Sequence, residues 1–390
     1  MTIQRIFLIA AGSILFFAVS AQARLQVPAP SGLTARNYLL MDADSDTVLT
    51  EKDADERVEP ASLTKIMTAY VVFRELQSGK LSLTEEVLVS EHAWRTGMTG
   101  ASRMYIDVNS LVKLEDLIRG MVVQSGNDAC VALAERIAGS EAAFVDVMNA
   151  QAQAMGLTNT RFQNSHGLPS ERPQFTSARD IVTLSKNLIR TFPEYYGYYS
   201  ERSFTYNKIT QHNRNLLLVR DPSVDGVKTG WTSAAGYNLV TSAQRDGMRV
   251  VAVVMGITAD SNQKGGAARA DQSQTLLNWG FRQFETHLVQ EPHKILAEPR
   301  IWNGAQKHLP VGIGVPLHVT IPRGSRESLR LEINLDQYIE APVTAGQPVG
   351  ELRVLVDDDP VKTHPLVALQ AASEGDIFRR SLDYLLRFFY

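Results

Sequence analysis

The sequence has a single cysteine among its 390 residues, Cys130, so the chain can form no disulfide within itself. Cys130 lies in an apolar stretch with a helical pattern, and we expect a small core residue there rather than a reactive thiol. Net charge is also nearly absent, with a formal value of -3 and no long basic run. Nothing in the charge pattern therefore indicates a nucleic-acid partner.

Two catalytic signatures are missing as well. The chain has no G-x-S-x-G, which is the best sequence sign of an α/β-hydrolase. Its eight histidines include no H-E-x-x-H and no tight cluster, so neither a metal site nor another cofactor is expected. What remains is an ordinary globular composition, 44% hydrophobic and 21% charged, in a chain long enough for two domains.

The first 23 residues have the pattern of an export signal. Arg5 supplies a positive flank, residues 6–19 form an apolar core, and residues 21–23 (Ala-Gln-Ala) are an A-x-A cleavage site. The apolar core is shorter than the ~20 residues that a membrane span needs, so an uncleaved anchor is the lesser alternative. We expect the mature chain to begin at Arg24, outside the inner membrane.

Three short motifs carry the chemistry of this chain: S-L-T-K at residues 62–65, S-G-N at residues 125–127 and K-T-G at residues 228–230. Ser62 and Lys65 are three residues apart, which places a nucleophile and a base on one helical face. The second motif offers a hydroxyl and an amide. The third offers an ammonium, a hydroxyl and a glycine whose missing side chain leaves a backbone edge open to a ligand. These groups can transfer an acyl group through a serine ester without histidine.

Context separates these motifs from chance copies. K-T-G occurs once, whereas S-x-x-K and S-x-N recur at an expected helix N-cap, in a polar loop and within a helix. Ser62 instead opens an apolar run, residues 66–73, that predicts the buried start of a helix. The further copies are, in that order, Ser110/Lys113, Ser261/Lys264 and Ser185/Asn187.

The chain resembles the low-molecular-mass penicillin-binding proteins, specifically the serine-type D-alanyl-D-alanine carboxypeptidases of the bacterial periplasm. The set S-x-x-K, S-x-N and K-T-G marks penicillin-binding proteins and class A β-lactamases. Further stretches similar to the carboxypeptidase family extend over nearly the whole chain, including its tail. They are residues 60–65, 124–129, 166–168, 177–180, 224–230, 235–239 and 279–281.

The elements expected around the motifs indicate an α/β catalytic domain over residues 24–288. The predicted fold is a mixed sheet covered by helices, plus a helical lobe, similar to β-lactamases and transpeptidases. We expect the site where the two lobes meet. The expected strands cover residues 37–42, 47–51, 236–243 and 248–256, and the expected helices residues 114–155 and 267–285.

The texture of the sequence changes near residue 289. Residues 289–375 contain short apolar runs separated by Pro and Gly, a spacing that suggests a small all-β C-terminal domain. No catalytic cluster occurs in it, so support or spacing is its expected role.

Residues 376–390 form a predicted amphipathic helix with a basic polar arc and an apolar, aromatic opposite side. Such a helix at a chain end is typical of a segment that lies in a membrane interface, so we expect attachment to a membrane surface. A terminal helix packed on its own domain is the alternative. The polar arc contains Arg379, Arg380, Asp383 and Arg387, and the apolar side contains Phe378, Leu382, Leu385 and Phe389, widened by Ile377, Tyr384 and Phe388.

Residue chemistry and the resemblance together assign catalytic roles. Ser62 is the expected nucleophile and Lys65 the base, because burial and the neighbouring ammonium of Lys228 would lower the pKa of Lys65 towards neutrality. Ser125 would relay a proton to the leaving amine, and Asn127 would hold the substrate amide. Both residues also fit helix capping.

The third motif and a distant arginine are expected to bind the substrate. Lys228 and Thr229 would face its terminal carboxylate, and Gly230 would let the edge strand approach. The family's strand implies that the backbone N–H of Trp231 is the second oxyanion donor. Family members also carry an arginine near the last helix that binds the free carboxylate of the terminal D-alanine, and alignment places Arg269 there.

The resemblance further implies that Asp180 and Arg214 pair to hold the loop beneath the site. Two solvated charges are the alternative.

These expectations describe a periplasmic D,D-carboxypeptidase on the outer face of the inner membrane. It would acylate Ser62 with the penultimate D-alanine of a peptidoglycan stem pentapeptide, release the terminal D-alanine and hydrolyse the ester. β-Lactams would mimic that dipeptide and inhibit the enzyme covalently. A class A β-lactamase is disfavoured, because no glutamate beyond the helical lobe and before the third motif stands in an E-x-x-L-N setting. A D,D-endopeptidase and a catalytically idle wall-binding protein on the same scaffold are two competing interpretations.

Overall fold

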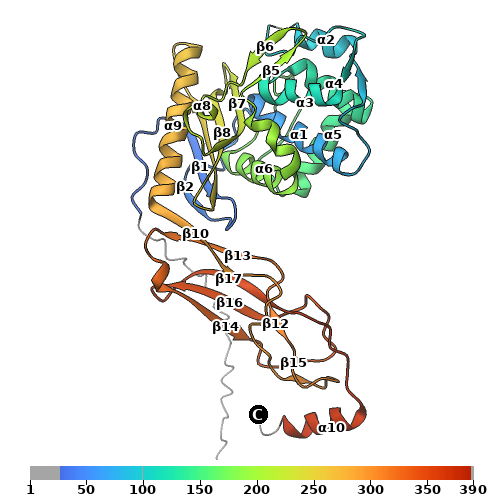
Figure 1. Cartoon of the computed structure of the whole chain (residues 1–390), viewed down its shortest axis with the longest axis vertical. Helices are drawn as coiled ribbons and strands as arrows, with labels where there is room; N and C mark the ends of the chain where they lie inside the picture. Colours follow the sequence, from blue (N-terminus) through green and yellow to red (C-terminus); the bar gives the residue numbers. More distant parts are fainter. Residues whose placement is uncertain (1–26, 99, 388–390) are drawn as a thin grey trace, which may run out of the picture. The chain divides into compact units, whose positions relative to one another are not determined.

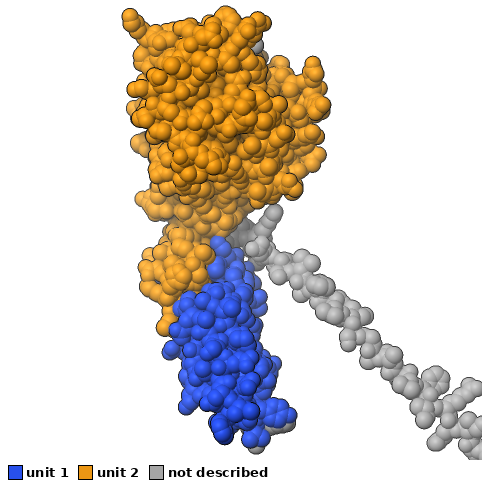
Figure 2. All heavy atoms as spheres, turned by 90° about the vertical axis from the view of Figure 1, so that its right-hand side faces the viewer, with its two compact units in different colours: residues 1–26, 298–311, 327–390 blue, residues 27–297, 312–326 orange. Residues whose placement is uncertain are grey.

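The computed structural model describes residues 27–98 and 100–387, so the predicted export signal at residues 1–23 lies outside the described residues. The described chain divides into two compact units, coloured separately in Figure 2. One contains residues 27–297 and 312–326, and the other contains residues 298–311 and 327–387.

A five-stranded sheet with the order β2-β1-β9-β8-β7 lies at the centre of the first unit. Strands from both ends of the unit meet in it, as predicted, because β1 pairs with both β2 and β9. All four pairings are antiparallel, whereas the sequence predicted a mixed sheet. Strands β7, β8 and β9 follow one another through short turns, which join antiparallel neighbours only. The strands are β1 (Asn37–Asp42), β2 (Val48–Lys52), β7 (Val224–Thr232), β8 (Gly236–Arg245) and β9 (Met248–Ile257).

Helices cover both faces of this sheet (Figure 1). Leu39 and Met41 pack into a core shared with α1 and α6, while Tyr38 and Leu40 pack into a core shared with α9. Successive side chains of a strand point to opposite faces, so a strand buried on both sides has a continuous apolar sequence. The covering helices are α1 (Lys65–Gln77), α6 (Ala178–Thr191) and α9 (Asn262–Gln283).

A helical lobe forms the rest of the first unit, and Cys130 is fully buried in its core, as predicted. The predicted helical stretch at residues 114–155 divides into three helices and a π-helical turn, η2. The α/β fold class is thereby confirmed. The further elements are η1 (Ala61–Thr64), β3 (Glu86–Leu88), α2 (Glu91–Gly97), β4 (Leu111–Lys113), α3 (Leu114–Arg119), η2 (Gly120–Gln124), α4 (Asn127–Ala138), α5 (Glu141–Ala154), α7 (Pro193–Tyr196), η3 (Gly197–Ser200), β5 (Ser203–Tyr206), β6 (Ile209–His212), α8 (Leu217–Arg220), β10 (Phe284–Gln290) and β13 (Leu317–Pro322).

The second unit is rich in β-structure, as predicted. Strands β14, β16 and β17 form an antiparallel meander-like sheet, in which β16 lies between the other two. The predicted domain start at residue 289 falls inside β10, which pairs with β13 in the first unit. The elements are β11 (Ile301–Trp302), β12 (Val311–Gly312), β14 (Leu329–Leu335), β15 (Ile339–Glu340), β16 (Pro348–Val356), β17 (Asp359–Ala368) and α10 (Ile377–Leu386).

Helix α10 confirms the predicted tail helix over its described part, and it docks on the second unit through its polar side. Asp383 is 2% exposed, and its carboxylate accepts hydrogen bonds from Arg300 and from the backbone N–H of Asn303. Arg387 pairs with Glu340 at 2.8 Å. The apolar side faces outward: Ile377, Phe378, Leu382, Tyr384 and Leu385 are each more than half exposed. Phe388 and Phe389 lie outside the described residues.

In residues 27–98 and 100–387, no helix combines the length and hydropathy that crossing a membrane requires.

Candidate active site

The three motifs meet at one cleft of about 790 Å³ in the first unit. Residues from η1, from the start of α4 and from β7 line it, so the site lies where the sheet meets the helical lobe, as predicted. The lining residues are Ser62, Gly100, Ala101, Ser102, Ser125, Asn127, Leu168, Pro169, Arg214, Leu216, Thr229, Gly230, Trp231, Thr232, Ser233, Tyr237, Asn262, Gln263, Gly266 and Arg269.

Ser62 and Lys65 stand one turn apart where η1 continues directly into α1. The Lys65 Nζ donates to Ser62 Oγ at 3.2 Å, to Asn127 Oδ1 at 2.8 Å and to the His166 carbonyl at 2.6 Å. Lys65 is only 1% exposed. An ammonium group has three N–H donors, and here each has a defined acceptor.

Burial, with a smaller contribution from the positive charge of Arg214, lowers the pKa of Lys65 to about 8. The sequence predicted the lowered pKa but named Lys228 as the cationic neighbour. The pKa of Lys228 is itself lowered well below its ordinary value by burial and by Lys65, Arg214 and Arg269. A lysine whose pKa lies near the working pH can take a proton from a serine hydroxyl.

Ser125 lies in a strained backbone conformation with its hydroxyl in the cleft. It ends η2 with φ of +69°, a region that L-residues other than Asn, Asp and His rarely adopt. Its Oγ is buried and has no hydrogen-bond partner among the described residues. Strain of this kind commonly marks functional sites. An unpaired hydroxyl is available to a substrate.

The capping alternative for the second motif does not hold. Gly126 occupies the N-cap position of α4, and no side chain caps it. Asn127 instead turns its Oδ1 to Lys65. Asp128 accepts the backbone N–H groups of Met104 and Tyr105, and thereby fixes the loop that brings Ala101 and Ser102 to the cleft.

The third motif lies on β7, which is the edge strand of the sheet. Lys228 and Thr229 are 3% and 6% exposed. A Cβ on Gly230 would lie 3.3 Å from Leu63 Cγ and 3.4 Å from Ala61 Cβ. Glycine therefore lets β7 pack closely against η1, which brings the third motif beside the first.

Trp231 follows on the same strand and forms part of the rim. Its side chain is 49% exposed and lies 5.7 Å from the Tyr237 ring, centroid to centroid. Its backbone N–H stays a predicted oxyanion donor, because the contacts of the described residues do not test that role.

Arg269 lies on α9 and also lines the cleft. It is 8% exposed, and burial lowers its pKa to about 10. Its Nη1 makes only a long, 3.4 Å hydrogen bond to the Gly230 carbonyl, and its Nε has no partner among the described residues. A buried guanidinium with unsatisfied donors is suited to bind a carboxylate.

Asp180 and Arg214 do not pair, which corrects the expectation from the resemblance. The Asp180 carboxylate accepts from Asn159 N at 2.8 Å and Thr160 Oγ1 at 2.7 Å. Arg214 lies in the cleft and donates to Ser102 Oγ at 2.7 Å. Sequence analysis thus missed Arg214 as a site residue, because an isolated arginine in a loop carries no motif.

The backbone carbonyl of His166 was also missed, although residues 166–168 contributed to the resemblance. Residue type does not reveal the role of a backbone carbonyl. The glycine at position 167 could, however, have indicated a tight turn beside it. Its φ is +85°, and a Cβ there would lie 1.8 Å from the Ala61 carbonyl oxygen. This turn holds the His166 carbonyl against the start of α1.

The chance copies of the motifs have different roles. The hydroxyl of Ser110 donates to the Asp107 carbonyl in a turn before β4, so the predicted N-cap role is wrong. Ser261 is the N-cap of α9, which therefore begins earlier than predicted and replaces the predicted loop. Ser185 donates to the Ile181 carbonyl within α6.

Within the described ranges, no group of three or more His, Cys, Asp or Glu side chains could hold a metal ion.

Comparison with known proteins agrees with this geometry. The profile of the family described as D-alanyl-D-alanine carboxypeptidase (peptidase family S11) matches residues 23–259, and that of the penicillin-binding protein 5 C-terminal domain matches residues 284–374. D-alanyl-D-alanine carboxypeptidase DacC of Escherichia coli (strain K12) is 41% identical over 98% of this chain and 96% of its own length. DacA of Haemophilus influenzae is 41% identical over 95% of this chain and 93% of its own.

Solved structures agree as well. Penicillin-binding protein 5 from Haemophilus influenzae superposes with a TM-score of 0.85 at 40% identity, covering 89% of this chain and 100% of its own. Penicillin-binding protein D2 of Listeria monocytogenes, solved in its ampicillin-bound form, has a TM-score of 0.58 at 28% identity over 65% of this chain and 100% of its own. With intact motifs, family profile and full-length relatives in agreement, the chain belongs to the D-alanyl-D-alanine carboxypeptidase family of serine peptidases.

Proposed function

We propose that Ser62 is the nucleophile and Lys65 its base in removing the terminal D-alanine of peptidoglycan stem pentapeptides. The observation that carries the proposal is the contact of Lys65 Nζ with Ser62 Oγ at 3.2 Å, in a site where burial lowers the pKa of Lys65 to about 8. Lys65 takes the hydroxyl proton as Oγ attacks the carbonyl carbon of the penultimate D-alanine.

Collapse of the tetrahedral intermediate breaks the C–N bond. The proton that Lys65 took passes through the otherwise unpaired Ser125 hydroxyl to the departing amine of the terminal D-alanine, which leaves Lys65 neutral again. The backbone N–H groups of Ser62 and Trp231 hold the oxyanion, and Asn127 orients the substrate amide. Water then hydrolyses the Ser62 ester. β-Lactams, whose amide resembles the scissile bond, acylate the same hydroxyl.

Cationic groups at the cleft recognise the substrate's free carboxylate. Lys65, Lys228, Arg214 and Arg269 lie close enough that three of them lower the pKa of Lys228. An anion bound among them would reduce this repulsion. Arg269 is the preferred clamp because its Nε is buried without a partner among the described residues, with Thr229 and Lys228 on the facing strand.

We further propose that residues 1–23 are an export signal, residues 24–288 the catalytic domain, residues 289–375 a β-rich support and residues 376–390 a membrane-surface anchor. The enzyme would then act in the periplasm, on the outer face of the inner membrane, in cell-wall synthesis and the maintenance of cell shape. The exposed apolar side of α10 supports the anchor.

A class A β-lactamase needs a glutamate at the site to hydrolyse the ester, and the described residues give little support for one. Between the second and third motifs, beyond the helical lobe, Glu171 and Glu194 are exposed and Glu201 pairs with Arg119. None is among the described residues that line the cleft. A D,D-endopeptidase would use the same residues and differ only in substrate. An idle wall-binding protein is disfavoured by the buried, positioned Lys65.

Labelling with a fluorescent penicillin, followed by mass spectrometry of the labelled peptide, tests this proposal. Ser62→Ala should abolish the label, whereas Ser110→Ala and Ser261→Ala should keep it, since these two hydroxyls bond to backbone groups elsewhere. Label that persists on the Ser62→Ala protein would refute the assignment of the nucleophile. Release of D-alanine from a pentapeptide, compared with cleavage of a cross-linked dimer, separates carboxypeptidase from endopeptidase.

A further inference from the structure

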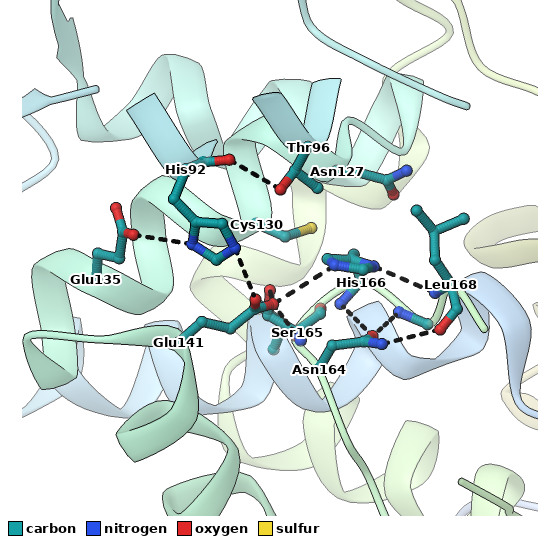
Figure 3. Close-up of polar contacts among 12 residues, drawn as sticks. His92, Thr96, Asn127, Cys130, Glu135, Glu141, Asn164, Ser165, His166 and Leu168 are labelled. Carbon is teal, nitrogen blue, oxygen red and sulfur yellow. Dashed lines mark hydrogen bonds and ion pairs between the residues drawn. The ribbon is translucent and has the colours of Figure 1, made fainter. Parts of the chain in front are cut away.

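A chain of polar contacts connects the base Lys65 with the surface of the helical lobe. Figure 3 shows the part of this chain around His166, Glu141 and His92. Its centre is Glu141, the first residue of α5, whose side chain is 14% exposed. The Glu141 Oε1 accepts the backbone N–H of Ser165 at 2.9 Å and the Ser165 hydroxyl at 2.6 Å. One carboxylate oxygen therefore holds the loop directly before the His166 carbonyl.

The same loop is fixed to α1 on its other side. Thr68 Oγ1 donates to the Ser165 carbonyl and Lys65 Nζ donates to the His166 carbonyl, each at 2.6 Å. Glu141 and α1 thus together hold two consecutive residues of this loop, Ser165 and His166. Any displacement of Ser165 moves the carbonyl that accepts the Lys65 ammonium.

The imidazole of His166 belongs to this arrangement. Its Nδ1 accepts the backbone N–H of Leu168 at 3.2 Å, and burial lowers the pKa of His166 to about 3. The ring is therefore neutral and carries its proton on Nε2, which faces Glu141 Oε1 at 3.6 Å. His92, on α2, approaches the other carboxylate oxygen at 3.7 Å and Glu135 at 3.2 Å.

We propose that Glu141 is a positioning residue for Lys65: its carboxylate fixes Ser165, the residue directly before the His166 carbonyl that accepts the Lys65 ammonium, and it adds a negative charge to the surroundings of Lys65. This inference rests on the proposed role of Lys65 as base. The charged and titratable groups that act on Lys65 are Asp128 and Cys130 from α4, Arg214 from the loop between β6 and α8, Glu141 from α5 and Lys228 from β7. Burial raises the pKa of Cys130 to about 12, so its thiol is neutral.

Two substitutions separate the two effects of Glu141. Glu141→Gln keeps an oxygen that accepts both Ser165 hydrogen bonds but removes the charge, whereas Glu141→Ala removes both. The matched control is Glu135→Gln, because Glu135 contacts the same His92 but not the loop. Lys65→Ala tests the base itself.

The measurement is the rate of Ser62 acylation by a labelled penicillin from about pH 6 to about pH 10, around the ordinary and lowered lysine pKa values. The wild-type rate should rise with pH as Lys65 loses its proton. The negative charge of Glu141 raises the pKa of Lys65, so Glu141→Gln should move this rise to lower pH and keep the high-pH plateau. Glu141→Ala should also lower the plateau roughly tenfold to a hundredfold, the range expected for misplacing a catalytic group. Glu135→Gln should change neither.

A Glu141→Gln profile that coincides with the wild type overturns the proposal, as does a folded Glu141→Ala protein with a wild-type plateau. Because a merely structural role of Glu141 would not shift the pH profile, the Gln variant decides even if the Ala variant fails to fold. Normal acylation by Lys65→Ala would instead contradict the proposed base, independently of the Glu141 variants.

Discussion

At the scale of single residues, the feature of the site that bears most on its chemistry is the burial of Lys65 away from solvent. Removing an ammonium from solvent favours its neutral form, and the pKa of about 8 for Lys65 reflects that balance. Three hydrogen bonds keep the charged form in one place. These properties suit the proposed roles, because the amine can be neutral near pH 8 and already contacts the Ser62 hydroxyl.

Loss of Lys65 should therefore cost acylation far more than folding. General-base catalysis typically contributes about 10²–10⁴-fold, so Lys65→Ala should lower the penicillin acylation rate by at least about a hundredfold. Since the neutral amine is the active form, kcat/KM of the wild type should fall about tenfold per pH unit below about pH 8. Acylation rates measured as a function of pH give both the loss in the variant and the pH dependence of the wild type, and circular dichroism checks that the variant folds. A loss below about tenfold would assign the base role to another group.

Arg269 should discriminate between substrates by their carboxyl end. Losing a charge-assisted hydrogen bond costs about 1.5–3 kcal/mol, so Arg269→Ala should reduce kcat/KM for a free D-Ala-D-Ala end by about ten- to a hundredfold. The matched amide-blocked substrate should change little. Lys264→Ala is the control, because Lys264 lies on the same helix but pairs with Asp260 at the surface. Equal losses on both substrates would make Arg269 structural.

Among the elements, the turn that ends η2 combines a strained backbone with the hydroxyl of Ser125, for which we propose a role in catalysis. A left-handed conformation costs an L-residue about 1–2 kcal/mol, whereas glycine adopts it freely but loses about 0.5–1 kcal/mol of backbone entropy. Ser125→Gly should therefore leave the free energy of unfolding unchanged or slightly higher while activity falls sharply.

Ser125→Ala is the matched variant, because it keeps the strain and removes the same hydroxyl. Urea unfolding and D-alanine release distinguish the two. If Ser125→Gly kept full activity, the hydroxyl would have no role in catalysis.

The sequence predicted correctly the elements that a local residue pattern determines. It did not predict the elements that depend on tertiary contacts. Residues 37–42 were predicted correctly as β1 because a short apolar run is a local signal. The start of α9 was missed, because Gly265 and Gly266 indicated a loop although Ser261 caps a helix there. The space at Gly265 is taken by the Tyr237 ring, and that packing contact cannot be read from the sequence.

The site residues likewise divide into those that a local motif predicts and those that depend on tertiary contacts. Residue type and spacing predicted that the three motifs meet at one cleft, and the structure brings them together there, while their catalytic roles stay predictions. The partners of Asp180 and Arg214 depend on how distant loops meet, so their pairing was predicted wrongly. The His166 carbonyl and Glu141 act through backbone groups, which have no signature in residue type.

On the scale of the whole molecule, the polar side of the tail helix is less free to bind lipid than the sequence predicted. Two of the three arginines of the polar arc pair with carboxylates of their own unit, Arg380 with Glu374 and Arg387 with Glu340. These pairs reduce the basic charge available to anionic lipid. Apolar burial should then supply most of the membrane affinity, and raising salt should weaken binding only in part.

The last prediction concerns that apolar side. Cutting the chain before Asp376 should release active enzyme from membranes, because the cleft residues all lie in the first unit. The cut also removes Asp383 and leaves Arg300 and the Asn303 N–H without an acceptor, which should destabilise the second unit by about 1–3 kcal/mol. Substitutions on the exposed apolar side of the helix, which leave Asp383 in place, therefore test the anchor more directly than truncation does.

Phe378 is 84% exposed and Leu382 is 57% exposed, so replacing both with Ser should change stability by less than about 0.5 kcal/mol per site. Binding to anionic liposomes, measured by sedimentation of protein without residues 1–23, should fall strongly while D-alanine release stays at the wild-type rate. Ile295→Ser is the control, since Ile295 is 58% exposed but lies outside the tail. Wild-type binding by the double variant would mean that the helix rests on its own unit and that the anchor lies elsewhere, with an uncleaved segment at residues 6–19 the first to examine.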